Sequence, residues 1–240
     1  MPSSGVSAEE EGKEAPAIDP RAVEVLSLAI EYLSGQEALS VDWFVSYDQV
    51  VDGREKLTRV RSGRNVMARG KGLYSYSENG SETREYFFDG STFQVVDRDN
   101  LVFAEARFAG GIDELADATQ EKFGVTLPMW QVLTNGSRSE LINDATAAAY
   151  LGETRLAGRA VHHLAFSNYD NDWQVWVLAD AVNPELVMLV GTDPYTQGWP
   201  QYRAYFTSWD FSPEIGEGTF HFQPDDSFEQ MTWSTPVVER

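Results

Sequence analysis

Three histidines, His162, His163 and His221, are the side chains of this chain best suited to acid–base or metal chemistry. His162 and His163 are adjacent in a stretch with strand-like alternation, where neighbouring side chains point to opposite faces. They therefore do not readily chelate one metal ion, and a zinc site would need His221, one of the pair and a carboxylate. We predict structural roles for all three, with no metal site and no cofactor.

Carboxylates and hydroxyls give no stronger catalytic set. Asp170, Asp172 and Asp180 flank one predicted strand and could form a glycosidase-like acid–base pair, but turns use the same residues. The chain has no cysteine, no G-x-S-x-G nucleophile elbow and no glycine-rich phosphate loop. We predict no catalytic residue and a protein that is not an enzyme. A hydrolase pairing His162 or His163 with a nearby aspartate is the least favoured alternative.

Two runs of strands with a helical insertion between them must position any site. Asp19 caps and Pro20 opens an amphipathic helix that ends at Gly35. From residue 40 the hydrophobic period changes to two, with Val41, Trp43, Val45 and Tyr47 on one face. Tight turns such as Asp52-Gly53 and Asn79-Gly80 then join six antiparallel strands. Residues 55–64 are mostly polar, which favours a place near the sheet edge.

A second run of strands covers residues 148–223, and residues 218–223 are its last predicted strand. It contains a hairpin from His162 to Leu178 with large side chains on both faces of its second strand. We expect Trp173, Val175 and Val177 to face the interior, and Gln174 and Trp176 to face outward. The helical insertion is predicted near residues 111–145.

The predicted fold class is mainly β with a helical lid (α+β). It consists of a single curved antiparallel sheet of about eleven strands, an unclosed half-barrel that wraps the N-terminal helix and the helical insertion. Residues 1–17 read as an acidic linker following a removed signal sequence, and residues 18–240 as one domain. We expect a monomer.

Net charge and hydropathy limit the kinds of partner that this protein can bind. The formal net charge of −20 disfavours nucleic acids and anionic membrane surfaces as partners. No apolar run reaches the roughly 20 residues that a transmembrane helix needs, so no transmembrane segment is predicted. Aromatic residues make up 12% of the chain. A curved sheet of this length has more inner surface than one or two helices would fill, so we expect a cavity lined by aromatic and aliphatic side chains.

Several strings resemble a family of predicted bacterial periplasmic proteins of unknown function: IDPRAVEVLSLAIEYL, YFFDGSTFQVVDRDNLVFA, HHLAFSNYDNDWQVWV and PQYRAYFTSWDFSP. The resemblance runs from Ile18 to the last strand. Where that family has a Pro-Leu-Pro-like segment with a basic residue, this chain has Asn183-Pro184-Glu185. The family is similar in fold to the lipoprotein carrier LolA and the receptor LolB, whose concave sheet binds acyl chains under a helical lid.

The resemblance implies an exported, periplasmic protein. It leaves open whether the full-length precursor carries a lipid anchor. It implies a non-enzymatic binder or carrier of a lipid, a lipoprotein acyl chain or another apolar molecule. The alternative is a sensor or protein-interaction module with a periplasmic protein partner. The expected apolar cavity wall comprises Trp43, Val45, Phe87, Phe93, Trp130, Leu164, Phe166, Trp173, Val175 and Phe206.

Overall fold

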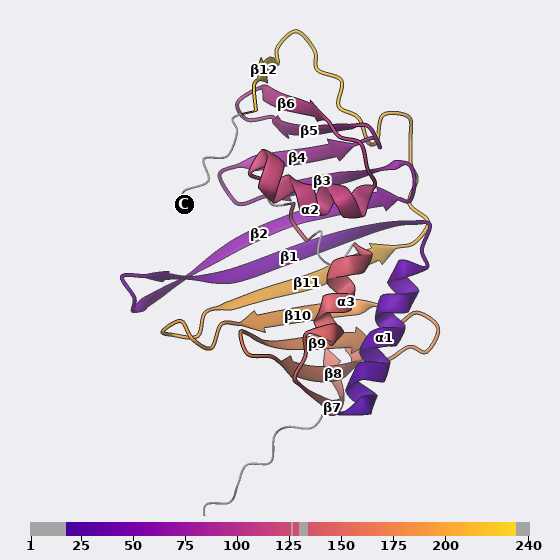
Figure 1. Cartoon of the computed structure of the whole chain (residues 1–240), viewed down its shortest axis with the longest axis vertical. Coiled ribbons are helices and arrows are strands. Elements are labelled where there is room, and N and C mark those ends of the chain that lie inside the picture. Colours follow the sequence, from indigo (N-terminus) through magenta and orange to yellow (C-terminus); the bar gives the residue numbers. More distant parts are fainter. Residues whose placement is uncertain (1–17, 126, 130–133, 234–240) are drawn as a thin grey trace, which may run out of the picture.

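The computed structural model describes residues 18–125, 127–129 and 134–233, in which three helices accompany one twelve-stranded sheet (Figure 1). The helices are α1 (Pro20–Ser34), α2 (Ile112–Phe123) and α3 (Asn135–Asn143). The strands are β1 (Ala38–Val51), β2 (Glu55–Ala68), β3 (Gly72–Glu78), β4 (Thr83–Phe88), β5 (Thr92–Asp97), β6 (Val102–Arg107), β7 (Ala147–Leu156), β8 (Arg159–Ser167), β9 (Asp172–Leu178), β10 (Leu186–Thr192), β11 (Gln201–Asp210) and β12 (Glu229–Met231).

The strand order is β12-β6-β5-β4-β3-β2-β1-β11-β10-β9-β8-β7, so the sheet is unclosed. All neighbours are antiparallel except β12, which pairs with β6 in parallel. The predicted fold class, mainly β with one unclosed antiparallel sheet around an N-terminal helix, is confirmed. The strand count is twelve instead of about eleven, since the short β12 adds an edge strand.

The helices cover one face of the sheet, which we call the helix face. In Figure 1, α1 and α3 lie over the β7–β11 half and α2 crosses the β2–β5 half. Asp19 caps α1 by accepting a 2.8 Å hydrogen bond from the N–H of Arg21. The buried side of α1, including Leu26 and Leu33, then joins the main core with Leu164 and Val175. Burial of this apolar surface is the main force that holds α1 to the sheet.

The β8–β9 hairpin lies as the alternation predicts. Trp173, Val175 and Val177 of β9 are buried on the helix face, whereas Gln174 and Trp176 lie on the outer face and are partly exposed. His163 stacks on Trp176 across the two strands, with ring centroids 4.2 Å apart. Large side chains on both faces of β9 are therefore explained by a core on one side and a cross-strand stack on the other.

A two-stranded arm formed by the ends of β1 and β2 projects from the sheet (Figure 1). β3 pairs with β2 only as far as Ser62, so residues 55–61 have β1 as their single neighbour. Asp52 and Gly53 turn the arm with positive φ values of 51° and 66°. The predicted place near an edge holds for residues 55–61, which pair on one side only, whereas residues 62–64 lie between β1 and β3. The polar composition of residues 55–61 reflects an arm that is solvated on both faces.

The predicted strand at residues 218–223 was wrong. Phe220 and Phe222 bury their rings against the outer face of the sheet, and Phe222 contacts Phe87 with centroids 5.8 Å apart. The amide of Gln94 donates to the carbonyl of Phe222 at 3.1 Å and accepts from its N–H at 2.9 Å. The side chain of Gln94 thus forms the hydrogen bonds to the N–H and C=O of Phe222 that a neighbouring strand would otherwise form.

Candidate functional site

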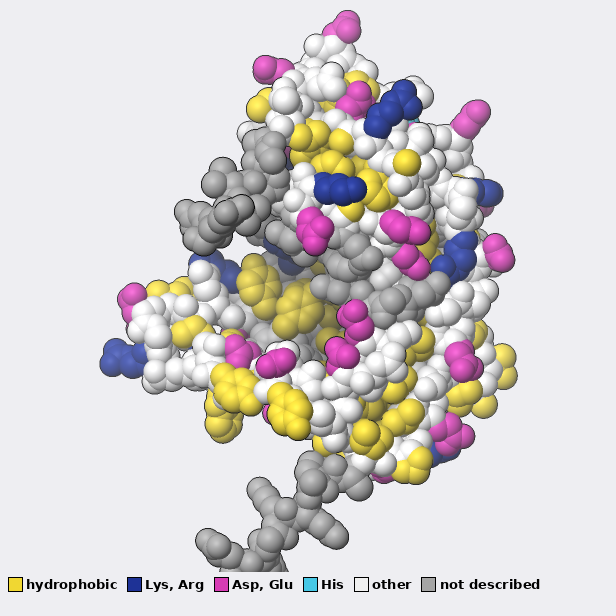
Figure 2. Space-filling model, in the orientation of Figure 1, with side chains coloured by type: hydrophobic (Ala, Val, Ile, Leu, Met, Phe, Trp, Pro, Cys, Tyr) yellow, Lys and Arg dark blue, Asp and Glu magenta, His cyan; other side chains and the backbone are white. Residues whose placement is uncertain are grey.

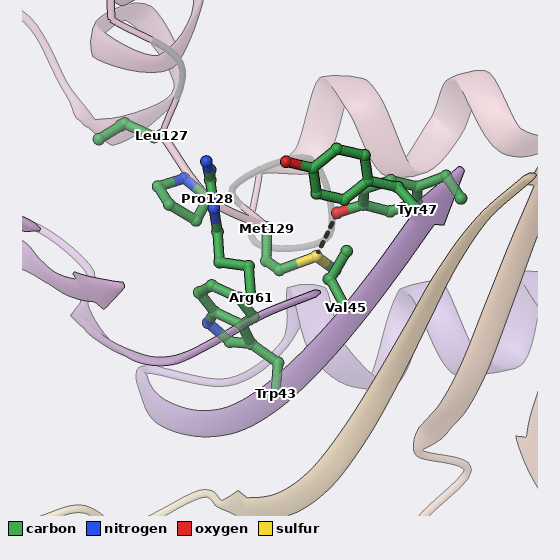
Figure 3. A pocket seen from close by; sticks show the side chains of 8 residues that line it. Trp43, Val45, Tyr47, Arg61, Leu127, Pro128 and Met129 are labelled. Carbon is green, nitrogen blue, oxygen red and sulfur yellow. Dashed lines mark hydrogen bonds between the residues drawn. The ribbon is translucent and has the colours of Figure 1, made fainter. Parts of the chain in front are cut away.

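A cavity of about 240 Å³ lies on the helix face, between the centre of the sheet and residues 127–129 (Figure 3). Val45 of β1 lies opposite Arg61 of β2 on one side and opposite Ala204 of β11 on the other. Tyr47 of β1 lies opposite Tyr202 of β11. The pairing therefore brings alternate residues of three strands to one place. Figure 2 shows the molecule hollowed beside the β1–β2 arm, with hydrophobic side chains inside. The lining residues are Trp43, Val45, Tyr47, Arg61, Leu127, Pro128, Met129 and Tyr202.

The ring of Trp43 is part of the cavity wall and crosses the neighbouring strand at Gly63. A Cβ atom at Gly63 would lie 2.4 Å from Cζ2 of Trp43 and 2.1 Å from the carbonyl oxygen of Tyr76. Both distances are far below van der Waals contact, so no larger residue fits without displacing the ring or the backbone. Glycine at this position lets Trp43, which is 2% exposed, lie flat against the sheet.

A buried amide, Asn65, ties the segment above the cavity to the sheet. Its oxygen accepts hydrogen bonds from Nε1 of Trp43 at 3.3 Å and from the hydroxyl of Ser75 at 2.8 Å. Its nitrogen donates to the carbonyl of Pro128 at 3.0 Å. Asn65 is 1% exposed, so water does not replace these bonds. One side chain therefore fixes both the aromatic wall and the position of residues 127–129.

A second tie joins Met129 to Tyr202 (Figure 3). The phenol of Tyr202 donates to the sulfur of Met129 at 3.0 Å. Burial raises the pKa of this phenol to about 12, against the opposing charge of Arg61, so the phenol keeps its proton at neutral pH. Met129 has φ of 56°, in the left-handed region that a residue with a side chain occupies at a cost of roughly 1–2 kcal/mol. The two ties hold the segment in that conformation.

Arg61 is the single charged side chain among the described lining residues. Its Nε is buried and has no hydrogen-bond partner. The other lining groups are apolar or aromatic, with phenol groups on Tyr47 and Tyr202. The cavity thus combines an apolar wall with one arginine whose Nε has no hydrogen-bond partner.

Of the predicted wall, Trp43 and Val45 line this cavity. Leu164 and Val175 are fully buried in the core under α1, and Phe206 packs on Trp209 with centroids 5.5 Å apart. Phe93 is fully buried against Phe123 of α2, at 5.3 Å. These four are buried in the main core and do not line the cavity.

Phe166 and Trp173 stack at 5.8 Å and line a separate, more open cavity of about 440 Å³ near the β7 edge. Phe87 was wrongly placed, because it lies on the outer face with Phe103 and Phe222, whereas its neighbour Phe88 faces the helices. Trp130 lies outside the described residues. The predicted wall is therefore divided among several locations.

The histidines have satisfied structural contacts. His162 Nδ1 is 3.0 Å from the hydroxyl of Tyr150, and its carboxylate contact, Glu153, is at 3.8 Å. His163 Nε2 is 2.9 Å from the amide oxygen of Gln174. His221 Nδ1 is 3.0 Å from Asp89, whose other oxygen caps the turn at residues 91–92. The hydrolase alternative requires His162 or His163 within hydrogen-bonding reach of a carboxylate. Among the described residues, neither histidine has a carboxylate at that distance.

Six lining residues were absent from the predicted wall. In β1, Tyr47 alternates with Trp43 and Val45, so the sequence already placed it on the same face. In β11, Tyr202 is four residues before Phe206, so the same alternation would have placed Tyr202 on the face of Phe206. No periodic pattern marks Leu127, Pro128 and Met129, which lie between helices. Arg61 occupies the cavity because of the β1–β2 register, which is not readable from residues 55–64 alone.

A comparison with protein families adds a sequence relationship. The family described as "Predicted periplasmic protein (DUF2092)" matches residues 22–232. The chain belongs to this family. The periplasmic location expected from the resemblance is thereby confirmed at the level of the family. No curated protein matches the chain. Within the described residues, no helix is both long and apolar enough to cross a membrane.

One solved structure shares the fold of this chain, and two more are similar at lower TM-scores. LprF from Mycobacterium bovis has a TM-score of 0.50 at 10% identity, covering 84% of this chain and 97% of LprF. The lipoprotein LppX from Mycobacterium tuberculosis has a TM-score of 0.49 at 13% identity, covering 82% and 100%. A LolA superfamily protein from Nitrosomonas europaea has a TM-score of 0.34 at 11% identity, covering 84% and 97%. At 10% identity the likeness to LprF shows the fold alone.

Proposed function

We propose that this DUF2092 protein is a non-enzymatic periplasmic carrier or binder of an apolar molecule, such as a lipid or a lipoprotein acyl chain. The ligand's chain occupies the cavity between Trp43, Val45 and Met129. The observation that carries the proposal is an apolar cavity of about 240 Å³ at the centre of the sheet, held open by a buried amide. The resemblance of the family's fold to that of the lipoprotein carrier LolA supports it.

The volume favours one chain over a whole lipid. Pockets for drug-sized ligands span roughly 300–1,000 Å³, so about 240 Å³ accommodates a single alkyl chain and not a diacyl lipid. The described wall contains no histidine, carboxylate, serine or cysteine, the groups that acid–base or nucleophilic catalysis needs. Binding is therefore the function that this wall supports.

Replacing Val45 by tryptophan tests this proposal. Val45 is 3% exposed and lies between Trp43 and Tyr47, so a larger side chain occupies the ligand's space. We expect the affinity for the neutral fluorescent probe N-phenyl-1-naphthylamine to fall at least tenfold, about 1.4 kcal/mol.

Phe44→Trp is the matched control, because Phe44 is the preceding residue, lies on the opposite face of β1 and is 38% exposed. Circular dichroism checks that both variants fold. If the wild-type protein binds no probe, or if the two variants bind equally well, the proposed site is wrong.

A second candidate function, a protein-interaction module, is favoured by three exposed aromatic residues. Tyr169, Tyr195 and Trp199 are 81%, 76% and 68% exposed, in the β8–β9 and β10–β11 loops. The hydroxyl of Tyr195 donates to the carbonyl of Tyr169 at 2.6 Å and joins the loops. Exposed aromatic residues are enriched at protein interfaces. A stoichiometric periplasmic partner that is retained by the wild type and lost by Trp199→Ser would favour this function.

A further inference from the structure

Arg61 is a partly buried arginine with no counter-charge, a property that it shares with Arg69 among the described residues. In a chain of net charge −20, six arginines lie within ion-pair distance of a carboxylate: Arg21, Arg64, Arg84, Arg98, Arg159 and Arg203. Arg61 has no such carboxylate in the described part of the chain, although acidic residues outnumber basic ones by 38 to 18. The absence of an acid beside Arg61 is therefore a local feature of the cavity.

The position of Arg61 makes this absence costly. Its guanidinium stays charged at any physiological pH, and its Nε is buried without a hydrogen-bond partner. Arg61 as a whole is partly exposed, and a guanidinium nitrogen that is buried without a hydrogen-bond acceptor is destabilising. Arg69 also has an unbonded buried nitrogen, but its Nε donates to the carbonyl of Gln36 at 2.8 Å. Among the described residues, Arg61 alone combines an unbonded, buried guanidinium nitrogen with a place in a cavity wall.

The surroundings of Arg61 fit the two ends of an amphiphile. Figure 3 shows the nitrogen end of Arg61 beside Pro128 and its aliphatic part nearer the ring of Trp43, with Met129 and, beyond it, Val45 to one side. A planar guanidinium binds carboxylate or phosphate oxygens through paired N–H donors. An alkyl chain attached to such a group would contact the apolar side chains.

We propose that the cavity binds a single-chain amphiphile with an anionic headgroup, a carboxylate or a phosphate, which pairs with Arg61. This inference rests on the proposed function and adds the chemical class of the ligand. The headgroup supplies the missing counter-charge, and the chain lies against Trp43, Val45 and Met129. A neutral chain of the same length gains the apolar contacts but leaves the guanidinium unpaired.

The test compares three competitors that share one chain: oleate, oleyl phosphate and oleyl alcohol. Each is titrated against N-phenyl-1-naphthylamine bound to the full chain. We expect the wild type to bind at least one of the two anions tenfold or more tightly than the alcohol. The anion preferred identifies the headgroup as a carboxylate or a phosphate.

Arg61→Gln should abolish that preference and leave the affinity for oleyl alcohol within about twofold. Arg61→Lys should restore part of it, since the charge is kept and the paired donors are lost. Arg59→Gln is the matched control, because Arg59 lies two residues away on the same strand and donates to Gln49 at 3.0 Å outside the cavity. It should retain the wild-type preference.

The results separate the two proposals. Equal binding of the three competitors, or a preference that persists in Arg61→Gln, would overturn the role of Arg61 while leaving the apolar site intact. Absence of binding by the probe and by every competitor would overturn the proposed function, and this inference with it.

Discussion

Gly63→Ala should lower the free energy of unfolding by roughly 3 kcal/mol, at the upper end of the typical cost of overpacking a core. The new methyl group would meet the carbonyl oxygen of Tyr76 at 2.1 Å and the Trp43 ring at 2.4 Å. A backbone oxygen in a central strand pair has little room to move, so the strain reaches both the β2–β3 pairing and the Trp43 side chain. Urea unfolding measures the loss, and the binding of N-phenyl-1-naphthylamine should weaken with it.

Gly191→Ala provides the matched control, since Gly191 lies in β10 and a Cβ there meets no atom within 4 Å. Alanine in a strand avoids the roughly 0.5–1 kcal/mol entropic cost of glycine, so this variant should be neutral or slightly more stable. Equal stability of the two variants would show that Trp43 does not lie across Gly63 as described.

Asn65→Ala should cost about 3 kcal/mol and release the segment above the cavity. The change leaves three groups without their partner: the indole N–H of Trp43, the hydroxyl of Ser75 and the carbonyl of Pro128. Each buried group that loses its hydrogen bond costs about 1–3 kcal/mol, less where water reaches it. Protease cleavage near residues 127–129 should accelerate, because their tie to the sheet is lost.

Ser75→Ala is the control for this network. It removes one hydrogen bond to Asn65 and keeps the bonds to Trp43 and Pro128, so we expect a loss of about 1 kcal/mol and unchanged cleavage. A similar cleavage rate for Asn65→Ala and the wild type would contradict the anchoring role. A similar loss of stability in both variants would contradict the assignment of Asn65 as the centre of the network.

Local patterns predicted much of this fold. The turn dipeptides and the period-two runs are short-range signals, and the Asp52-Gly53 turn and the β8–β9 hairpin lie where those signals indicate. Asp19 and Pro20 likewise mark the start of α1 within one residue. Each of these features depends on residues that are close in the sequence.

Features set by distant contacts were not predicted. Residues 218–223 alternate like a strand, but Gln94, more than a hundred residues earlier, takes up the backbone groups of Phe222. In the same way, alternation separates Phe87 from Phe88 without showing which of the two faces the helices. That choice depends on the register of the whole sheet and on what covers each face.

The cavity shows the same division. Trp43 and Val45 could be predicted because they are large, apolar and alternate in a central strand. Arg61 could not, since its place beside Val45 follows from pairing between strands. Residues 127–129 have no secondary-structure pattern, and the hydrogen bond from Asn65 positions them.

The most direct test of the central claim is a crystal structure of the protein saturated with a terminally brominated dodecanol. This neutral chain tests the apolar site independently of Arg61. The anomalous signal of bromine locates the chain without reference to other density. We predict one bromine site within the cavity bounded by Trp43, Val45 and Met129. Bromine only beside Phe166 and Trp173, only on the outer surface, or nowhere at saturation would contradict the account.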